Sequence, residues 1–158
     1  MNRKTCFNCG FKQWLTIKIL IGAISFLLIA CNKITSGNDL TESDIKKIKK
    51  LGILNDNEGI IKFYSEYKKN VAGNFFTNKR IASYWKDENN KTKDNINSAF
   101  YQDIIRIDTI TNAGASFSPY INVMRKDSTT FKVCFDGEKA EIRKTFEEVI
   151  SIWKSNKK

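Results

Sequence analysis

The sequence predicts a mainly β domain with a capping helix, in the α+β class, from three observations. Short runs of β-branched and aromatic residues, separated by turn residues, recur between Gly59 and Asp136. A long amphipathic helical pattern follows these runs, and a shorter one precedes them. We expect about six to seven antiparallel strands in a small barrel or sandwich, which the C-terminal helix closes.

The composition restricts the classes of function that the chain can have. Its 158 residues suffice for one ordinary domain and a short appendage. There is no histidine, which excludes Ser-His-Asp and Cys-His catalysis and histidine-ligated zinc. Lys and Arg number 27 against 17 Asp and Glu, for a net charge of +10. These basic residues are scattered among acidic ones, so no nucleic-acid partner is expected.

The N-terminal segment has the layout of a secretory signal peptide. An apolar run from Ile19 to Ala30 follows four basic residues, and no acidic residue precedes Asp39. As a helix this run would rise about 18 Å, well short of the roughly 30 Å hydrocarbon core of a bilayer. The sequence therefore predicts a signal peptide over residues 1–30. An uncleaved transmembrane anchor, extended back to Trp14, is the alternative.

The apolar run ends in Leu28-Ile29-Ala30-Cys31, which resembles the lipobox of bacterial lipoproteins. The resemblance implies signal cleavage between Ala30 and Cys31, followed by lipidation of the Cys31 thiol. Two or more acyl chains are enough to hold a protein stably on a membrane. The resemblance thus implies a lipid-anchored, extracytoplasmic protein of the bacterial cell envelope. Asn32 at the next position favours the outer membrane over the inner one.

The part after the signal begins with a small, polar segment. Residues 31–38 predict a flexible tether, and a domain is expected over residues 39–158. Thr41 predicts the N-cap of a short helix, and Gly52 predicts its end. The apolar residues of this helix recur at helical spacing, at Ile45, Ile48 and Leu51.

The central part of the chain predicts strands joined by short turns and one polar loop. Thr77-Asn78-Lys79 and Lys126-Asp127-Ser128 predict the turns of two hairpins, and residues 87–95 predict an exposed loop. The strand-like segments are 61–67, 73–76, 80–85, 99–107, 120–125 and 130–135.

The C-terminal segment predicts an amphipathic helix. Asp136 or Gly137 is expected to cap its start. Its apolar residues recur on one broad face, at Ile142, Phe146, Val149, Ile150 and Trp153.

Two segments resemble signatures of bacterial PH-like and GRAM-like domains. Residues 73–81 resemble the element "small, apolar strand, T-N/D-x-R, apolar strand", and residues 101–107 resemble "y-x-D-I-x-x-I". The resemblance covers roughly residues 58–154 and implies a PH-like split barrel that binds and does not catalyse. Phe75, Ile81, Ile104 and Ile107 would then fill the barrel, with Phe146 and Trp153 closing one mouth.

Four basic residues are the candidate ligand-binding residues that this resemblance suggests. Phosphoinositide-binding members of the family carry a basic cluster in the first hairpin loop, which Lys68, Lys69, Lys79 and Arg80 partly imitate. An anionic lipid headgroup or an envelope protein is the expected partner. Arg80 is also expected to satisfy backbone carbonyls or to pair with Asp103.

No catalytic residue, metal or cofactor is expected. Cys6 and Cys9 form a single C-x-x-C unit that would leave with the signal, and Cys134 is expected to be a partly exposed free thiol. An envelope enzyme that uses paired carboxylates remains the alternative to a binding or structural domain.

Overall fold

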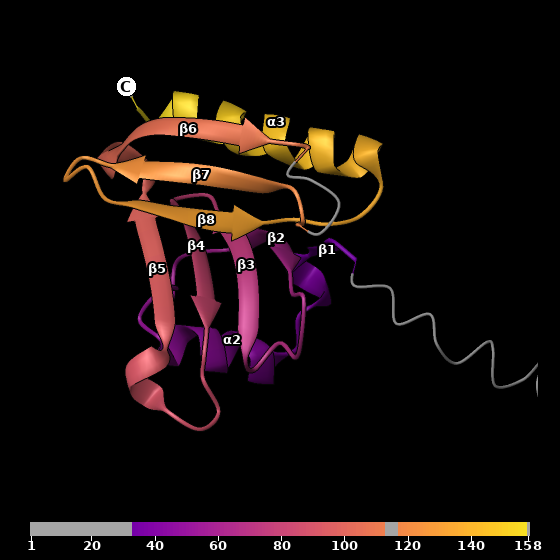
Figure 1. Ribbon diagram of the computed structural model, residues 1–158, viewed down its shortest axis with the longest axis vertical. Coiled ribbons are helices and arrows are strands. Elements are labelled where there is room, and N and C mark those ends of the chain that lie inside the picture. Colours follow the sequence, from indigo (N-terminus) through magenta and orange to yellow (C-terminus); the bar gives the residue numbers. More distant parts are fainter. Residues whose placement is uncertain (1–32, 113–116, 158) are drawn as a thin grey trace, which may run out of the picture. The chain divides into compact units, whose positions relative to one another are not determined.

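The computed structural model describes residues 33–112 and 117–157 (Figure 1). Their strands form two antiparallel sheets, of five and three strands. The first sheet has the order β1 (Thr35–Ser36), β2 (Ile60–Tyr64), β3 (Ala72–Thr77), β4 (Arg80–Trp85) and β5 (Asn95–Phe100). The second has the order β6 (Ile104–Ile110), β7 (Tyr120–Arg125) and β8 (Thr130–Cys134). The helices are α2 (Glu42–Lys50) and α3 (Lys139–Asn156), with short 3-10 turns η1 (Gly37–Asp39), η2 (Lys91–Lys93) and η3 (Tyr101–Asp103).

The predicted fold class is confirmed, because the described chain is mainly β and ends in a helix. The strands of the second sheet run across those of the first, and α3 runs alongside the second sheet (Figure 1). Neither sheet closes on itself. The described residues form eight strands, more than predicted, because a short β1 joins the first sheet and the run 99–107 is divided between the sheets.

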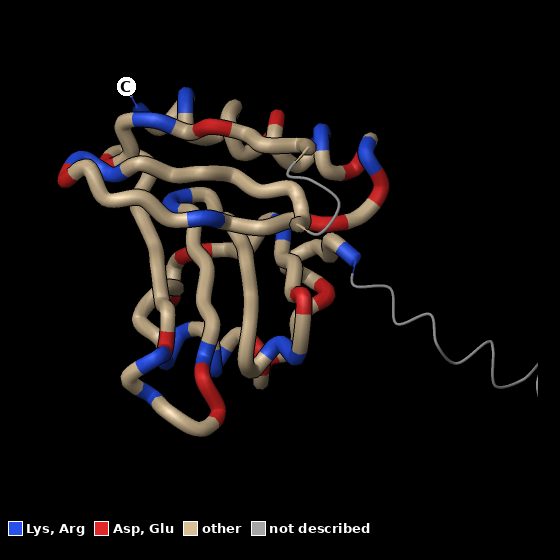
Figure 2. The backbone as a smooth tube through the Cα atoms, viewed as in Figure 1, with Lys and Arg blue, Asp and Glu red and all other residues tan. Residues whose placement is uncertain are grey.

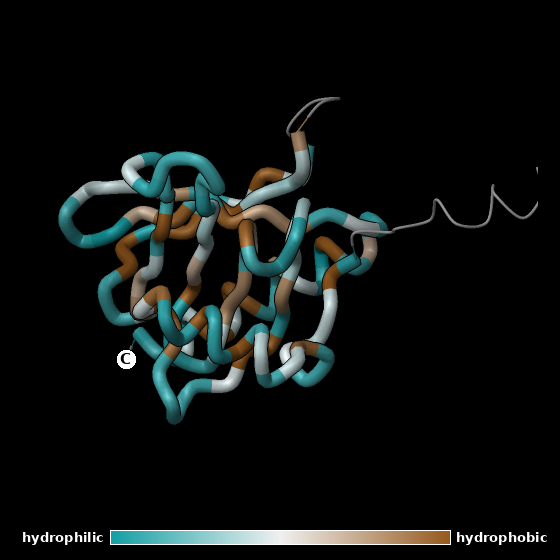
Figure 3. Tube along the Cα trace, turned by 90° about the horizontal axis from the view of Figure 1, so that it is seen from below, coloured by the Kyte–Doolittle hydropathy of each residue, from teal (hydrophilic) through white to brown (hydrophobic). Residues whose placement is uncertain are grey.

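Two hydrophobic clusters lie on opposite faces of the first sheet. Phe76 and Ile81 belong to the larger cluster, between the two sheets and α3, whereas Phe75 and Ala82 belong to a smaller cluster under α2. Adjacent strand residues point to opposite faces, which explains why neighbours belong to different clusters. Seen from below, hydrophobic and hydrophilic positions are interspersed along the chain (Figure 3), and all six residues of β3 are buried because this strand lies between the two clusters.

The expectation that Phe75 fills the same core as Ile81 is therefore wrong, since Phe75 packs on the α2 side. Ile81 and Ile104 are fully buried in the larger cluster, as predicted, and Ile107 packs against it. Phe146 is buried in that cluster as well. Trp153 packs at its edge, where its indole nitrogen donates to the Ile104 carbonyl over 3.4 Å.

The local signals for α2 and the two hairpins are confirmed. Thr41 caps α2, and its hydroxyl accepts a hydrogen bond from the Asp44 amide while the Asp44 carboxylate accepts one from the Thr41 amide. Gly52 follows the helix at a φ of 74°, a conformation that glycine adopts without strain. The hairpins β3–β4 and β7–β8 lie where the turn residues predicted them.

Three segments differ from the prediction. Tyr67 lies in the loop after β2 and is half exposed, so the first strand ends earlier than expected. The run 99–107 is broken by η3, where Tyr101 turns into the core and donates its hydroxyl proton to the Thr77 carbonyl. Glu138, rather than Asp136 or Gly137, is the N-cap of α3, and its side chain makes no capping hydrogen bond.

The segment predicted as a tether is largely part of the fold. Ile34 is 4% exposed and belongs to the larger cluster, and Thr35 pairs with Phe63 in the first sheet. Ser36 then caps η1 through a reciprocal pair of hydrogen bonds with Asp39. Residues 34–38 are therefore part of the fold, and the predicted domain boundary at residue 39 is wrong.

Candidate functional site

The structure separates the four predicted cations. Arg80 is 3% exposed, and its Nη2 atom lies 2.6 Å from Oε1 of Glu58, whose side chain is fully buried. The expected pairing with Asp103 is wrong, because Asp103 instead lies 3.7 Å from Lys126 at the surface. Arg80 is thus a core residue whose charge is balanced inside the protein, and it presents no cationic group to a surface ligand.

Lys79 and Lys68 lie apart from each other. Lys79 lines a shallow hollow with Phe100 and Gln102 at the start of η3. Lys68 lies over the ring of Tyr67, with its ammonium 5.1 Å from the ring centroid. Neither lysine lines the cavity to which Lys69 contributes.

Lys69 lines a cavity of about 250 Å³ between α2 and the ends of the neighbouring strands. We call this cavity the lysine pocket, because four lysines from three parts of the chain line it. Lys47 and Lys50 come from α2, Lys69 from the β2–β3 loop, and Lys86 from the residue after β4. The remaining lining residues are Ile48, Leu51, Asn70 and Tyr84. Basic positions of these segments gather at the end of the first sheet beside α2 (Figure 2).

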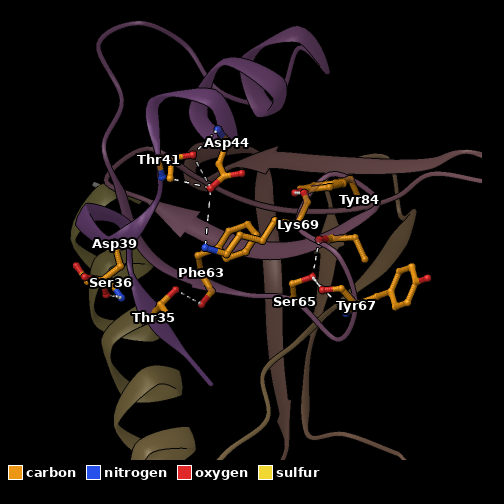
Figure 4. A network of polar contacts seen from close by, with 11 residues as sticks. Thr35, Ser36, Asp39, Thr41, Asp44, Phe63, Ser65, Tyr67, Lys69 and Tyr84 are labelled. Carbon is orange, nitrogen blue, oxygen red and sulfur yellow. Dashed lines mark hydrogen bonds and ion pairs between the residues drawn. The ribbon is translucent and has the colours of Figure 1, made fainter. Parts of the chain in front are cut away.

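Hydrogen bonds hold the Lys69 segment against the sheet (Figure 4). The Tyr84 hydroxyl donates to the backbone carbonyl of Lys69, and the Ser65 hydroxyl contacts the carbonyls of Tyr67 and Ala72. Gly73 leaves room for the Tyr84 ring, since a Cβ there would lie within 2.6 Å of the ring atom Cζ. Burial raises the pKa of Tyr84 above its usual value, so its hydroxyl stays protonated as a donor.

The lysine pocket is strongly cationic but carries one nearby counter-charge. Asp44, in the first turn of α2, has its Oδ2 atom 3.9 Å from the Lys69 ammonium (Figure 4). Lys49, on the same helix, is turned toward Asp56 at 2.7 Å and does not line the pocket. The lining therefore includes four lysine residues, with one carboxylate adjacent to it, a charge balance that attracts an anion.

An exposed aromatic pair lies on the segments that carry the lysines. Tyr67 and Trp85 stack with ring centroids 6.5 Å apart, and they are 50% and 44% exposed. Each aromatic residue directly precedes a basic one, Lys68 and Lys86. Tyr and Trp side chains are enriched where proteins meet the membrane–water interface.

Of the predicted cations, only Lys69 lines the lysine pocket, and three other lysines went unrecognised. Lys47 and Lys50 are three residues apart, a spacing that puts them on one side of a helix. That spacing was a usable signal. No pattern in the sequence predicts that Lys86 lies beside these two lysines, because this proximity depends on how β4 packs against α2.

Neither an activated Cys134 thiol nor a cluster of metal-ligand side chains is present in the described residues. Burial, with a contribution from Glu66, raises the pKa of the Cys134 thiol to about 11, so the reactive thiolate is scarce at neutral pH. Within residues 33–112 and 117–157, no group of three or more His, Cys, Asp or Glu side chains could hold a metal ion. The same residues contain no helix long and apolar enough to cross a membrane. Ala30 and Cys31 lie outside the described residues.

No protein-family model matches the chain, and no curated protein matches it. Its fold is similar to a solved structure described as the crystal structure of a DUF1696 family protein with a pleckstrin-homology domain, from Shewanella loihica PV-4. The two chains are 15% identical, and the match covers 80% of this chain and 99% of that chain with a TM-score of 0.49.

Proposed function

We propose that the chain is a non-catalytic binding domain of the bacterial cell envelope, anchored by lipid on Cys31, which holds an anionic group in the lysine pocket. The observation that carries the binding part is the convergence of Lys47, Lys50, Lys69 and Lys86 on one cavity of about 250 Å³. A cavity of this size suits a phosphate or carboxylate group of a larger ligand, such as an anionic lipid headgroup.

The order of elements supports a PH-like architecture for this domain. One antiparallel sheet is followed by a three-stranded sheet and then by a long helix whose apolar face packs into the core between the sheets. This order agrees with the resemblance that the segments 73–81 and 101–107 carry. PH-like architecture favours a binding platform over an enzyme, although a fold alone does not determine function.

The division of the chain supports an anchor at Cys31. A boundary between two units of the chain falls after Cys31, and the described residues from Lys33 on have their own hydrophobic core. Removal of residues 1–30 by a signal peptidase would therefore leave the second unit intact. After that removal the net charge is about +6, which favours residence near an anionic surface.

The lipid anchor can be tested by metabolic labelling of the full chain in a bacterium. We expect labelled palmitate to be incorporated into the wild type and into Cys134→Ser, because the modified thiol is that of Cys31. The variant Cys31→Ser is expected to carry no label. Equal labelling of the wild type and Cys31→Ser would contradict the anchor.

The lysine pocket can be tested by vesicle binding of the unit Asn32–Lys158, which has its own core. Each lysine near an anionic surface contributes about 1 kcal/mol, so the double variant Lys69→Gln/Lys86→Gln should bind phosphatidylglycerol vesicles about 30-fold more weakly. The matched control is Lys144→Gln/Lys154→Gln, which removes two exposed lysines from α3. If both double variants weaken vesicle binding equally, the net positive charge of the domain, and not the lysine pocket, accounts for the binding.

A further inference from the structure

The lipid anchor and the folded domain are separated by very little chain. Ile34 is buried in the larger cluster and Thr35 is paired with Phe63, so Asn32 and Lys33 alone lie between Cys31 and the first core residue. Three residue steps span at most about 11 Å when fully extended. The headgroup layer on each side of a bilayer is about 5–7 Å thick. Even fully extended, this connection passes the headgroup layer by only about 4–6 Å, so the domain stays next to the headgroups.

We propose that the surface around β1 lies directly on the bilayer, in contact with phospholipid headgroups. This inference rests on the proposed function, because it assumes that Cys31 carries the acyl chains. A domain held in this way does not rotate freely above the membrane, since the strand nearest the anchor is fixed in a sheet by β2. One face of the domain is therefore kept against the lipid.

The contacts of β2 identify the rest of this face. Tyr64 follows the residue that pairs with Thr35, and it belongs to the larger cluster together with Phe135. The Phe135 amide donates to the carbonyl of Pro119, just before β7, over 3.0 Å. The Ser118 hydroxyl donates to Asp136, which follows β8, over 3.1 Å. The β1 edge, the segment before β7 and the β8–α3 connection therefore adjoin one another (Figure 1).

Phe117 is the apolar residue of this face that suits a bilayer. It is 73% exposed, the most exposed of the large hydrophobic side chains in the described chain. It lines one open cavity together with Pro119, Lys139 and Arg143. Phe side chains with basic residues nearby occur in segments that lie in the interface of a bilayer.

The charges on this face are balanced. Lys33, Lys139 and Arg143 are opposed by Asp136, Glu138 and Glu141. Electrostatic attraction to anionic lipid therefore does not keep this face on the bilayer. The short connection to the anchor keeps it there, and the Phe117 side chain contributes. It follows that the contact should be the same on neutral and on anionic bilayers, unlike binding in the lysine pocket.

The test uses the full-length lipoprotein, purified from membranes and reconstituted into phosphatidylcholine vesicles that contain a lipid with a spin label near its headgroup. In a Cys134→Ser background, a fluorophore is attached to Phe117→Cys or, as the matched control, to Lys93→Cys in η2 at the far end of the first sheet (Figure 1). We expect the spin label to quench the fluorophore at position 117 and not at position 93. Replacement of phosphatidylcholine by phosphatidylglycerol should leave this difference unchanged.

A longer connection provides the second arm of the test. A Gly-Ser insertion of about twelve residues after Lys33 adds roughly 20 Å of mean reach, and quenching at position 117 is expected to fall. Equal quenching at both positions, no quenching at position 117, or no effect of the insertion would overturn the inference. Mass spectrometry of the same sample shows whether Cys31 is lipidated, so a failure of the proposed function is seen separately.

Discussion

Replacement of Glu58 by Gln is expected to destabilise the domain by about 3–5 kcal/mol, because it leaves the buried Arg80 guanidinium without its charge partner. The two side chains are 0% and 4% exposed, and they are joined at 2.6 Å. The Arg80 guanidinium also lies 4.0 Å from the Phe100 ring centroid, and its buried Nε atom has no hydrogen-bond partner among the described residues. No other acidic side chain is ion-paired with it in the described chain.

The measurement is the free energy of unfolding from denaturant titration of Asn32–Lys158. A double variant, Glu58→Leu/Arg80→Met, removes both charges and should recover much of the lost stability, because no unpaired charge remains buried. The exposed pair of Lys49 and Asp56 is the matched control, and Asp56→Asn should leave the unfolding midpoint unchanged. A loss below about 1 kcal/mol in Glu58→Gln would contradict the buried pair.

Replacement of Gly37 by Ala should have the next largest effect on stability, a loss of about 1–3 kcal/mol. A Cβ at this position would overlap the backbone carbonyl oxygen of Ile60, which cannot move without disturbing β2. The chain would respond by separating β1 and η1 from the first sheet, and this would expose Ile34.

The neighbouring variant Asn38→Ala is the control, because Asn38 is exposed and lies on the same short turn. Hydrogen exchange of the Thr35 and Phe63 amides would report the separation of β1 from β2 directly. If Gly37→Ala and Asn38→Ala were equally stable, residues 34–38 would be a tether after all. The inference that the domain is held on the bilayer would then lose its basis.

The elements that the sequence predicted well depend on neighbours in the chain. The Thr41 cap, the turn at Gly52 and the two short hairpins each involve contacts between residues a few positions apart. Such contacts leave a recognisable pattern of residue types. This is why α2, β3–β4, β7–β8 and the apolar face of α3 could be anticipated.

The features that the sequence missed depend on contacts between distant segments. Arg80 was expected in a ligand-binding cluster, or paired with Asp103, from a resemblance to a family motif. Its actual partner, Glu58, lies 22 residues away in the chain. Ile34 stands in a polar segment, and only its pairing with β2 makes it a core residue. The lysine pocket similarly requires Lys86 to be brought beside α2. These arrangements follow from how the sheet and helices pack.

The most direct test of the central claim, that this domain is tethered to a membrane through Cys31, is mass spectrometry of the N-terminal peptide of the protein isolated from bacterial membranes. We expect a peptide that begins at Cys31 and carries the mass of a diacylglycerol group, with or without a further acyl chain. A protein that still begins at Met1 and has an unmodified Cys31 thiol would contradict it.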